Sequence, residues 1–381
     1  MELFNVWNLE KVNIKLRTNF TKKINNIISL KFKTKNDAYN KIIYDKNIPF
    51  ITFKNLLKES YTKEFFVPLE IFLKICLSLN ISKEELQKNI VSYKTAGGVN
   101  FIEEPKLPII ITPVFDMLLA HHFGDGTVIN PKNNRIPYFG YRQFNDFYRS
   151  AYVHKLENVF GKIKYKKDYF LLSTRPYCPP VLSTLFFKYY NLSINDFLSE
   201  RARLPSIILN KGKDSLLAFL VAFIIDEGNI DSTQISIKLK NKLLIEDLNK
   251  ICNILGYKSK IINSKEADYF GVYILREGMN KLYKDYLILN KKYPIINLGI
   301  KGERIKSSFE IFNRPISRIS GNNNLILEIL KNEELSVNQI ADRINMTRQG
   351  VRYHIHKLIK DNKIKIIDNT NLNWIYGIKK C

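Results

Sequence analysis

Two acidic residues occupy the same place in two similar stretches of the chain. LLAHHFGDG carries Asp125 before Gly126, and LVAFIIDEG carries Glu227 before Gly228. Both stretches are apolar, which predicts two buried helices that end in a carboxylate, and glycine is a common residue after a helix. Like charges at packed helix ends raise each other's pKa or require a cation, and Mg²⁺ prefers carboxylate, water and phosphate oxygens. The pattern predicts a Mg²⁺ site at Asp125 and Glu227, whereas the structural alternative is two buried helices with polar ends.

The segments that carry these acids repeat one plan. Ala120 and Ala222 lie five residues before the two acids, where a small side chain lets helix backbones approach closely. Two strands, a helix, two strands and a final helix are predicted after each acid. The sequence therefore predicts an α+β fold with tandem αββαββα repeats, at 106–210 (the first segment) and 211–315 (the second segment). The strands are expected at 127–129, 137–144, 163–166 and 169–173, then 234–240, 257–263 and 269–275, and the intervening helices at 146–160 and 243–255.

The ends of the chain show two other patterns. Residues 20–92 are predicted to form short helices, with Ser82 and Glu85 as a capping box, and the pattern resembles a Cro/repressor-type helix-turn-helix domain over 1–97. An ordinary helical bundle is the alternative. The fold expected for the whole chain is thus a central pair of repeats flanked by two all-α or winged-helix domains.

Residues 321–381 follow a turn-rich linker and resemble a winged helix-turn-helix. Helices are predicted at 325–330, 336–344 and 348–360, and a two-stranded wing at 363–367 and 374–378. The third helix would present Arg348, Gln349 and Arg352 to a major groove. Such domains also bind proteins, and the sequence leaves both functions open.

The charge of the chain favours a polyanionic partner. The 381 residues include 60 Lys and Arg against 36 Asp and Glu, a formal charge of +24, and residues 11–35 hold eight basic and no acidic residues. An AT-rich genome is the other explanation for many lysines. The sequence contains no long apolar run, no evident signal peptide and no paired cysteines, so a cytoplasmic protein without a membrane partner is expected.

The two motifs and their repeat resemble the LAGLIDADG (DOD-type) homing endonucleases in their single-chain, two-repeat form. The resemblance implies a monomer with internal pseudo-twofold symmetry, in which a β-saddle binds double-stranded DNA and Mg²⁺ supports a staggered double-strand cut. It implies that Asp125 and Glu227 hold the metal and that the basic Arg203 and Lys301 lie near the scissile phosphates. The DNA contacts it implies on the strands are Arg142, Gln143, Lys166, Lys238 and Lys240.

Some residues depart from the family motif. His121 and His122 stand where glycine or an aliphatic residue is usual. Asp226 directly precedes Glu227, so either residue could be the second acid of the motif. The spacing from Ala222 favours Glu227. A free-standing enzyme is expected, because the chain has no His-Asn pair that would mark an intein. A non-catalytic transcription regulator and an RNA maturase built on the same fold are the alternative functions.

Overall fold

The computed structural model describes residues 2–43, 48–131, 136–165, 176–197, 201–264, 268–313, 321–369 and 374–379. It is a mixed structure of helices and several small sheets. The chain divides into two compact units, Met1–Asn229 with Gln234–Gly302, and Ile230–Thr233 with Glu303–Cys381. The N-terminal segment and most of both repeat segments thus share one unit, and the division into four domains stays a prediction.

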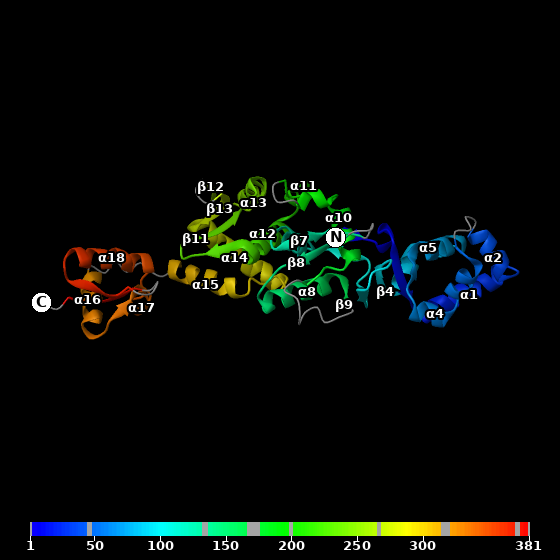
Figure 1. Cartoon of the computed structure of the whole chain (residues 1–381), viewed down its shortest axis with the longest axis horizontal. Helices are drawn as coiled ribbons and strands as arrows, with labels where there is room; N and C mark the ends of the chain where they lie inside the picture. The colour runs from blue at the N-terminus through cyan, green and yellow to red at the C-terminus, as the bar shows by residue number, and fades with distance from the viewer. Residues whose placement is uncertain are drawn as a thin grey trace. The chain divides into compact units, whose positions relative to one another are not determined.

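Helices make up most of the N-terminal segment, drawn in blue in Figure 1. The expected Ser82 cap forms, and its Oγ accepts from the backbone N–H of Glu85 at 3.1 Å. The expectation of an all-α domain is wrong, because Val12, Ile14 and Leu16 are buried while Asn13 and Lys15 between them are less so, which is the alternation of a strand. The helices are α1 (Thr18–Lys31), α2 (Lys35–Ile42), α3 (Phe50–Leu56), α4 (Glu59–Glu64), α5 (Leu69–Ser78) and α6 (Lys83–Lys88).

Two sheets join this N-terminal segment to the first segment. One has the strand order β3-β2-β4-β5-β9, and the other pairs β1 with β6 in antiparallel fashion. The β5–β9 pairing crosses the domain boundary that the sequence predicted near residue 97. The strands are β1 (Glu2–Phe4), β2 (Val12–Leu16), β3 (Val67–Pro68), β4 (Ile90–Thr95), β5 (Phe101–Glu103), β6 (Ile109–Ile111) and β9 (Lys162–Lys164).

The first segment follows the predicted order of elements as far as it is described. Its elements are α7 (Pro113–Phe123), β7 (Gly126–Ile129), β8 (Tyr138–Tyr141), α8 (Asp146–Phe160), β9, α10 (Pro180–Tyr189) and the 3₁₀ helix η2 (Ile194–Phe197). β7 and β8 form an antiparallel pair, while β9 pairs with β5 instead of joining them. The strand predicted at 169–173 lies outside the described residues.

The second segment contains the predicted αββαββα order. Its sheet has the strand order β10-β11-β13-β12, and helices α12, α13 and α14 contact its strands (Figure 1). The elements are α11 (Ser206–Leu209), α12 (Lys213–Glu227), β10 (Gly228–Ile230), β11 (Gln234–Leu239), α13 (Lys242–Ile254), β12 (Ser259–Ser264), β13 (Tyr269–Leu275), α14 (Arg276–Lys292) and α15 (Ile300–Asn313). The boundary between the two compact units falls within α15. A pseudo-twofold saddle built from both segments stays a prediction.

Helices α7 and α12 form the centre of the first unit. Every residue of 113–122 and of 216–225 is buried, and these two helices pack against each other more extensively than any other pair of elements described. An apolar surface all round a helix is typical of a central core position. The packing therefore explains why both motif stretches are almost wholly apolar up to their acids.

The second unit contains a small domain with its own core. Ile326, Leu330, Ile340, Val351 and Ile355 are among the buried residues of this core. The domain comprises α16 (Asn322–Asn332), β14 (Leu335–Ser336), α17 (Val337–Arg343), α18 (Arg348–Lys360), β15 (Ile364–Asp368) and β16 (Ile375–Ile378), with strand order β14-β16-β15. The helices and wing agree with the predicted order, and α18 has the predicted bounds. In the part of the chain that the structure describes, no helix has the length and apolarity needed to span a membrane.

Candidate active site

The ends of α7 and α12 meet with almost no space between them. A Cβ atom at Gly124 would lie 2.7 Å from Asp226 Oδ2, closer than any real contact of this kind. The glycines that follow the two acids are equally confined, since a Cβ at Gly126 or Gly228 would lie within 2.5 Å of a carbonyl oxygen of the preceding helix. Glycine is therefore required at these positions by close backbone approach. This contact zone, from 120 to 126 and from 222 to 228, is called the seam below.

The two predicted metal-binding acids are brought together at the seam. Burial, followed by the negative charges of Asp226 and Glu227, raises the pKa of Asp125 to about 8. Burial also raises the pKa of Glu227, followed by the charge of Asp226. Both acids stay partly exposed. The seam therefore gathers carboxylates that repel one another when ionised, which is the condition that a bound cation relieves.

Lys301 lies at the same seam. Its Nζ donates to the carbonyl oxygens of Ile224 and Ile225, at 2.9 and 2.6 Å, in the last turn of α12. A cation at this end of a helix interacts favourably with the helix dipole. Its charge lowers the pKa values of Asp125 and Glu227 and so opposes part of their mutual repulsion. The sequence placed Lys301 near the chemistry, and the structure puts it beside the acids.

Arg203 lies elsewhere. Its Nε and Nη2 donate to the two carboxylate oxygens of Asp247 in α13, at 3.2 and 3.1 Å. Asp247 is only 3% exposed, and it also accepts from the backbone N–H of Leu204. This bidentate pair ties the connector between the two segments to α13. The geometry gives Arg203 an anchoring function, in place of the predicted position near a phosphate.

Asp226 was not among the predicted site residues, yet it has the densest set of contacts at the seam. Its side chain is fully buried and accepts from Tyr141 Oη at 2.6 Å and from His121 Nδ1 at 2.9 Å. Burial raises the pKa of Asp226 to about 7, although the hydrogen bond from Tyr141 and the charge of Lys155 oppose the rise. Because Asp226 is enclosed and Glu227 is not, the geometry favours Glu227 as the acid that faces a ligand.

Buried groups of the first segment surround Asp226. Lys155 of α8 is 2% exposed, and burial lowers its pKa to about 8. Burial, and then the charge of Lys155, hold the pKa of His121 well below its ordinary value. His121 is therefore neutral at pH 7, and its Nδ1–H donates to Asp226. The sequence noted His121 and Asp226 separately, but the two residues are 105 positions apart, so only the fold pairs them.

His122 has a different environment from His121. Its Nε2 lies 2.8 Å from Tyr152 Oη, and its ring stacks on Phe139 with a centroid distance of 4.0 Å. Burial lowers its pKa, and the neighbouring His121 lowers it further. His122 is thus a packed residue of the first segment's core. The described residues contain no group of three or more His, Cys, Asp and Glu side chains arranged to hold a metal ion.

The donor set at the seam fits a hard divalent cation. Asp125 and Glu227 offer carboxylate oxygens and no sulfur or imidazole ligand, which suits Mg²⁺ better than a soft metal. Mg²⁺ is usually held by one or two carboxylates and completes its coordination with water and phosphate oxygens. Two partly exposed carboxylates are therefore enough, and a cage of protein ligands is not needed.

The predicted DNA-contacting residues of the strands have varied surroundings. Gln143 Nε2 donates to Asp125 Oδ2, so this amide supports the acid instead of facing outward. The Arg142 guanidinium lies over the Phe144 ring at 5.6 Å. Lys238 and Lys240 are exposed on and just after β11. Lys166 lies outside the described residues.

The C-terminal candidates share one helix. Arg348, Gln349 and Arg352 are all exposed on α18, which begins at the Thr347 cap. Thr347 Oγ1 accepts from the backbone N–H of Gly350 at 3.0 Å. The exposed side chains at the start of this helix have the arrangement that a recognition helix requires.

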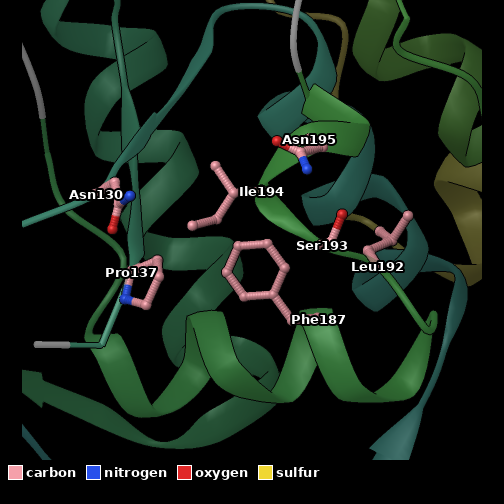
Figure 2. Close-up of a pocket in the computed structure, with 7 residues that line it drawn as sticks. All are labelled: Asn130, Pro137, Phe187, Leu192, Ser193, Ile194 and Asn195. Carbon is pink, nitrogen blue, oxygen red and sulfur yellow. The ribbon is translucent and has the colours of Figure 1, made fainter. Parts of the chain in front are cut away.

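A separate cavity of about 420 Å³ opens beside the β7–β8 hairpin (Figure 2). Phe187 of α10 lies across it from the hairpin residues Asn130 and Pro137. The remaining lining residues are Leu192, Ser193, Ile194 and Asn195. None of the lining side chains is titratable, so this cavity offers packing and hydrogen bonding but no acid–base chemistry.

Known proteins resemble two regions of this chain. Residues 323–365 match the family model described as winged helix-turn-helix DNA-binding. A structure of mesophilic variants of the homing endonuclease I-DmoI is 19% identical, covers 51% of this chain and 97% of its own, and gives a TM-score of 0.36. I-DmoI in complex with DNA and Ca is 18% identical over 51% and 97%, with a TM-score of 0.34. The homing endonuclease I-WcaI bound to its DNA recognition sequence is 15% identical over 45% and 80%, with a TM-score of 0.31. The match and the fold of α16–β16 agree that the chain ends in a winged helix-turn-helix domain.

Proposed function

We propose that the chain is a metal-dependent DNA endonuclease of the homing type, which makes a staggered double-strand cut at a long site. One observation carries the proposal: Asp125, Glu227 and Lys301 converge where the two central helices end. Clusters of acids with raised pKa values beside a fixed cation are typical of sites that do chemistry. A protein that only bound DNA would gain nothing from placing ionisable carboxylates against each other at an energetic cost.

Each residue at the seam has a separate role in the proposed reaction. Asp125 and Glu227 would hold Mg²⁺, which when bound supplies an activated water and charge stabilisation of the leaving oxygen. Gln143 fixes the orientation of the Asp125 carboxylate by its hydrogen bond. Lys301 favours the ionised form of both acids, which is the form that binds a cation. Its ammonium group is also a suitable partner for a phosphate oxygen.

DNA binding is proposed from the charged surfaces of both units. Arg348, Gln349 and Arg352 on α18 would enter a major groove, where Arg and Gln side chains distinguish base edges. Lys238 and Lys240 would contact the backbone from the second segment. The proposal includes the finer features that the resemblance implies, namely a monomer with two pseudo-symmetric repeats and a second helix-turn-helix at the N-terminus.

A cleavage screen tests the proposal. The full chain is incubated with a randomised duplex library in Mg²⁺ and, separately, with a chelator. Cutting is expected only with Mg²⁺, and Asp125→Asn and Glu227→Gln should each reduce it by about 10²–10³-fold while they still bind the selected duplex. Glu84→Gln, which makes the same chemical change at an exposed position on α6, is the matched control.

Three results would contradict the proposal. Cutting at the wild-type rate by both acid variants would show that these acids do not form the metal site. Tight duplex binding without any cutting would leave transcription regulation as the function. Stronger binding of structured RNA than of duplex DNA in a gel-shift comparison would point to a maturase.

A further inference from the structure

The two helix ends at the seam are unequal in one position. Gly124 and Asp226 each stand directly before the acid of their own segment. The space that a side chain at Gly124 would fill is occupied by the Asp226 carboxylate, whose Oδ2 would lie 2.7 Å from a Cβ built there. The glycine of one segment therefore makes room for the aspartate of the other.

Both side chains that donate to the Asp226 carboxylate come from the first segment. His121 Nδ1 lies at 2.9 Å and Tyr141 Oη at 2.6 Å. His121, in α7, stands one turn before Asp125, and the residue after Tyr141, Arg142, donates its backbone N–H to the Asp125 carbonyl oxygen at 2.8 Å. The side chain of Asp226 is fully buried, so these bonds do not compete with solvent. A carboxylate of the second segment thus holds both elements that flank the first segment's acid.

We propose that Asp226 is a positioning residue for the metal site: by accepting from His121 and Tyr141 across the seam, it fixes the end of α7 that carries Asp125 relative to Glu227. The inference rests on the proposed function, because it assumes that these two acids share a cation. Glu227 is the next residue of the same helix, so the last turn of α12 carries its own acid and also holds the end of α7 in place. Asp226 is not itself a ligand in this arrangement, since its oxygens are enclosed and accept hydrogen bonds from His121 and Tyr141.

Manganese binding separates this role from a ligand role. Mn²⁺ is titrated into the full chain bound to a duplex that was selected from a random pool by binding alone, and bound Mn²⁺ is measured by electron paramagnetic resonance with the duplex as blank. Asp226→Ala removes both bonds and should weaken Mn²⁺ binding by about 10–100-fold, the usual cost of losing a residue that orients a ligand. Asp226→Asn keeps the size of the side chain and an oxygen that accepts from Tyr141, so it should rescue binding to near the wild-type value. Strand-resolved cleavage should follow the same order.

Three outcomes overturn the proposal. If Asp226→Asn loses Mn²⁺ as completely as Asp125→Asn does, Asp226 is a ligand. If Asp226→Ala binds Mn²⁺ like the wild type, the hydrogen bonds that Asp226 accepts do not position the metal site. If Asp226→Ala does not fold, Tyr141→Phe removes one donor without opening a cavity, and it should weaken Mn²⁺ binding about fivefold, as expected for one lost hydrogen bond. Unchanged affinity in Tyr141→Phe also overturns the proposal.

Failure of the proposed function would look different. In that case Asp125→Asn and Glu227→Gln would bind Mn²⁺ as the wild type does, and the metal site itself would be absent. The positioning role fails alone when those two variants lose Mn²⁺ and the changes at Asp226 have no effect.

Discussion

The ends of α7 and α12 carry equivalent acids but are supported by different chemistry. Before Asp125 the first end has two histidines, whereas the equivalent positions before Glu227 are Phe223 and Ile224. The fixed cation Lys301 is bound to the carbonyl groups of the α12 end. His121 bonds Asp226 across the seam and Gln143 donates to Asp125, whereas Lys301 is bound to the helix end that carries Glu227. Equal spacing in a sequence thus does not imply equal roles for the surrounding residues.

The two basic residues that the sequence treated as counterparts show the same inequality. Lys301 lowers the pKa values of the seam acids, while Arg203 is held by Asp247 in α13. An arginine with a bidentate carboxylate partner is already satisfied and has little reason to leave it. Four experiments test whether the two helix ends differ in this way.

Lys301→Met should give the largest effect. Cleavage in Mg²⁺ is expected to fall by about 10²-fold at neutral pH, because a fixed positive charge in a partly enclosed site is lost. Lys301 lowers the pKa values of Asp125 and Glu227, so its loss raises them and moves the rise of activity with pH to higher pH. The defect should therefore be smaller at pH 9 than at pH 7. Lys284→Met, at an exposed position on α14, is the control, and an unchanged pH profile would place Lys301 outside the site.

Asp125→Asn should change the stability of the metal-free protein. The pKa of Asp125 rises from 3.8 to about 8 on folding, so the folded chain binds more protons than the unfolded chain between these values. The contribution of the Asp125 carboxyl to wild-type stability is then fully present at low pH and is lost as pH rises towards 8. At pH 8 with a chelator, Asp125→Asn should unfold roughly 4–8 °C higher, the equivalent of about 2 kcal/mol of relieved repulsion.

Calorimetry with and without Mg²⁺ checks this second prediction. Added Mg²⁺ should raise the unfolding temperature of the wild type at pH 8 and leave that of Asp125→Asn unchanged. Glu84→Gln should behave as the wild type does. If the stability difference between Asp125→Asn and the wild type does not grow between pH 5 and pH 8, Asp125 is not held at a raised pKa.

Arg203→Met should affect stability and leave the chemistry intact. Asp247 would lose its bidentate partner but would keep Lys250 and the Leu204 N–H, so the loss should be about 1–3 kcal/mol. Denaturant unfolding measures this loss, and cleavage is assayed well below the unfolding temperature. A cleavage defect as large as that of Lys301→Met would show that Arg203 and Lys301 have equivalent roles at the two helix ends.

Arg352→Ala should have the smallest effect, because α18 belongs to neither helix end. Loss of one phosphate or base contact should cost about 1 kcal/mol of DNA affinity and reduce the salt dependence of binding by about one charge. Cleavage of the bound duplex should be unchanged on both strands. Lys357→Ala is the control, since nine residues place Lys357 on the opposite side of α18 from Arg348. An equal loss in both variants would argue against a specific recognition face.

Local patterns were predicted well from the sequence. The bounds of α8 and α18 agree with the prediction, because each has a clear cap and an apolar period. The seam acids could be predicted because an acid followed by glycine recurs after two apolar stretches. The meeting of the two helix ends that carry Asp125 and Glu227 is expected from that repeat, whereas Lys301 was expected there only from the family resemblance, and the roles of all three stay predictions.

Contacts between distant residues could not be predicted. The strands β1 and β2 were missed because three to five residues carry too weak an alternation. Arg203 was misplaced because its partner Asp247 lies 44 residues away and carries no local signal. The bond between His121 and Asp226 spans the two segments and depends on the exact approach of α7 and α12. Such pairs are fixed by packing, which a periodic pattern does not encode.

The shared sheets at the N-terminus limit how this protein can be rearranged. Because β5 pairs with β9 and β1 pairs with β6, the helices α1–α6 are not an interchangeable module in front of an independent central region. A shortened chain that begins at residue 106 would leave two strands with open edges, and open edges invite aggregation. A fusion of the central helices to another domain would thus have to include the first hundred residues, whereas the C-terminal domain, with its own core, can be exchanged.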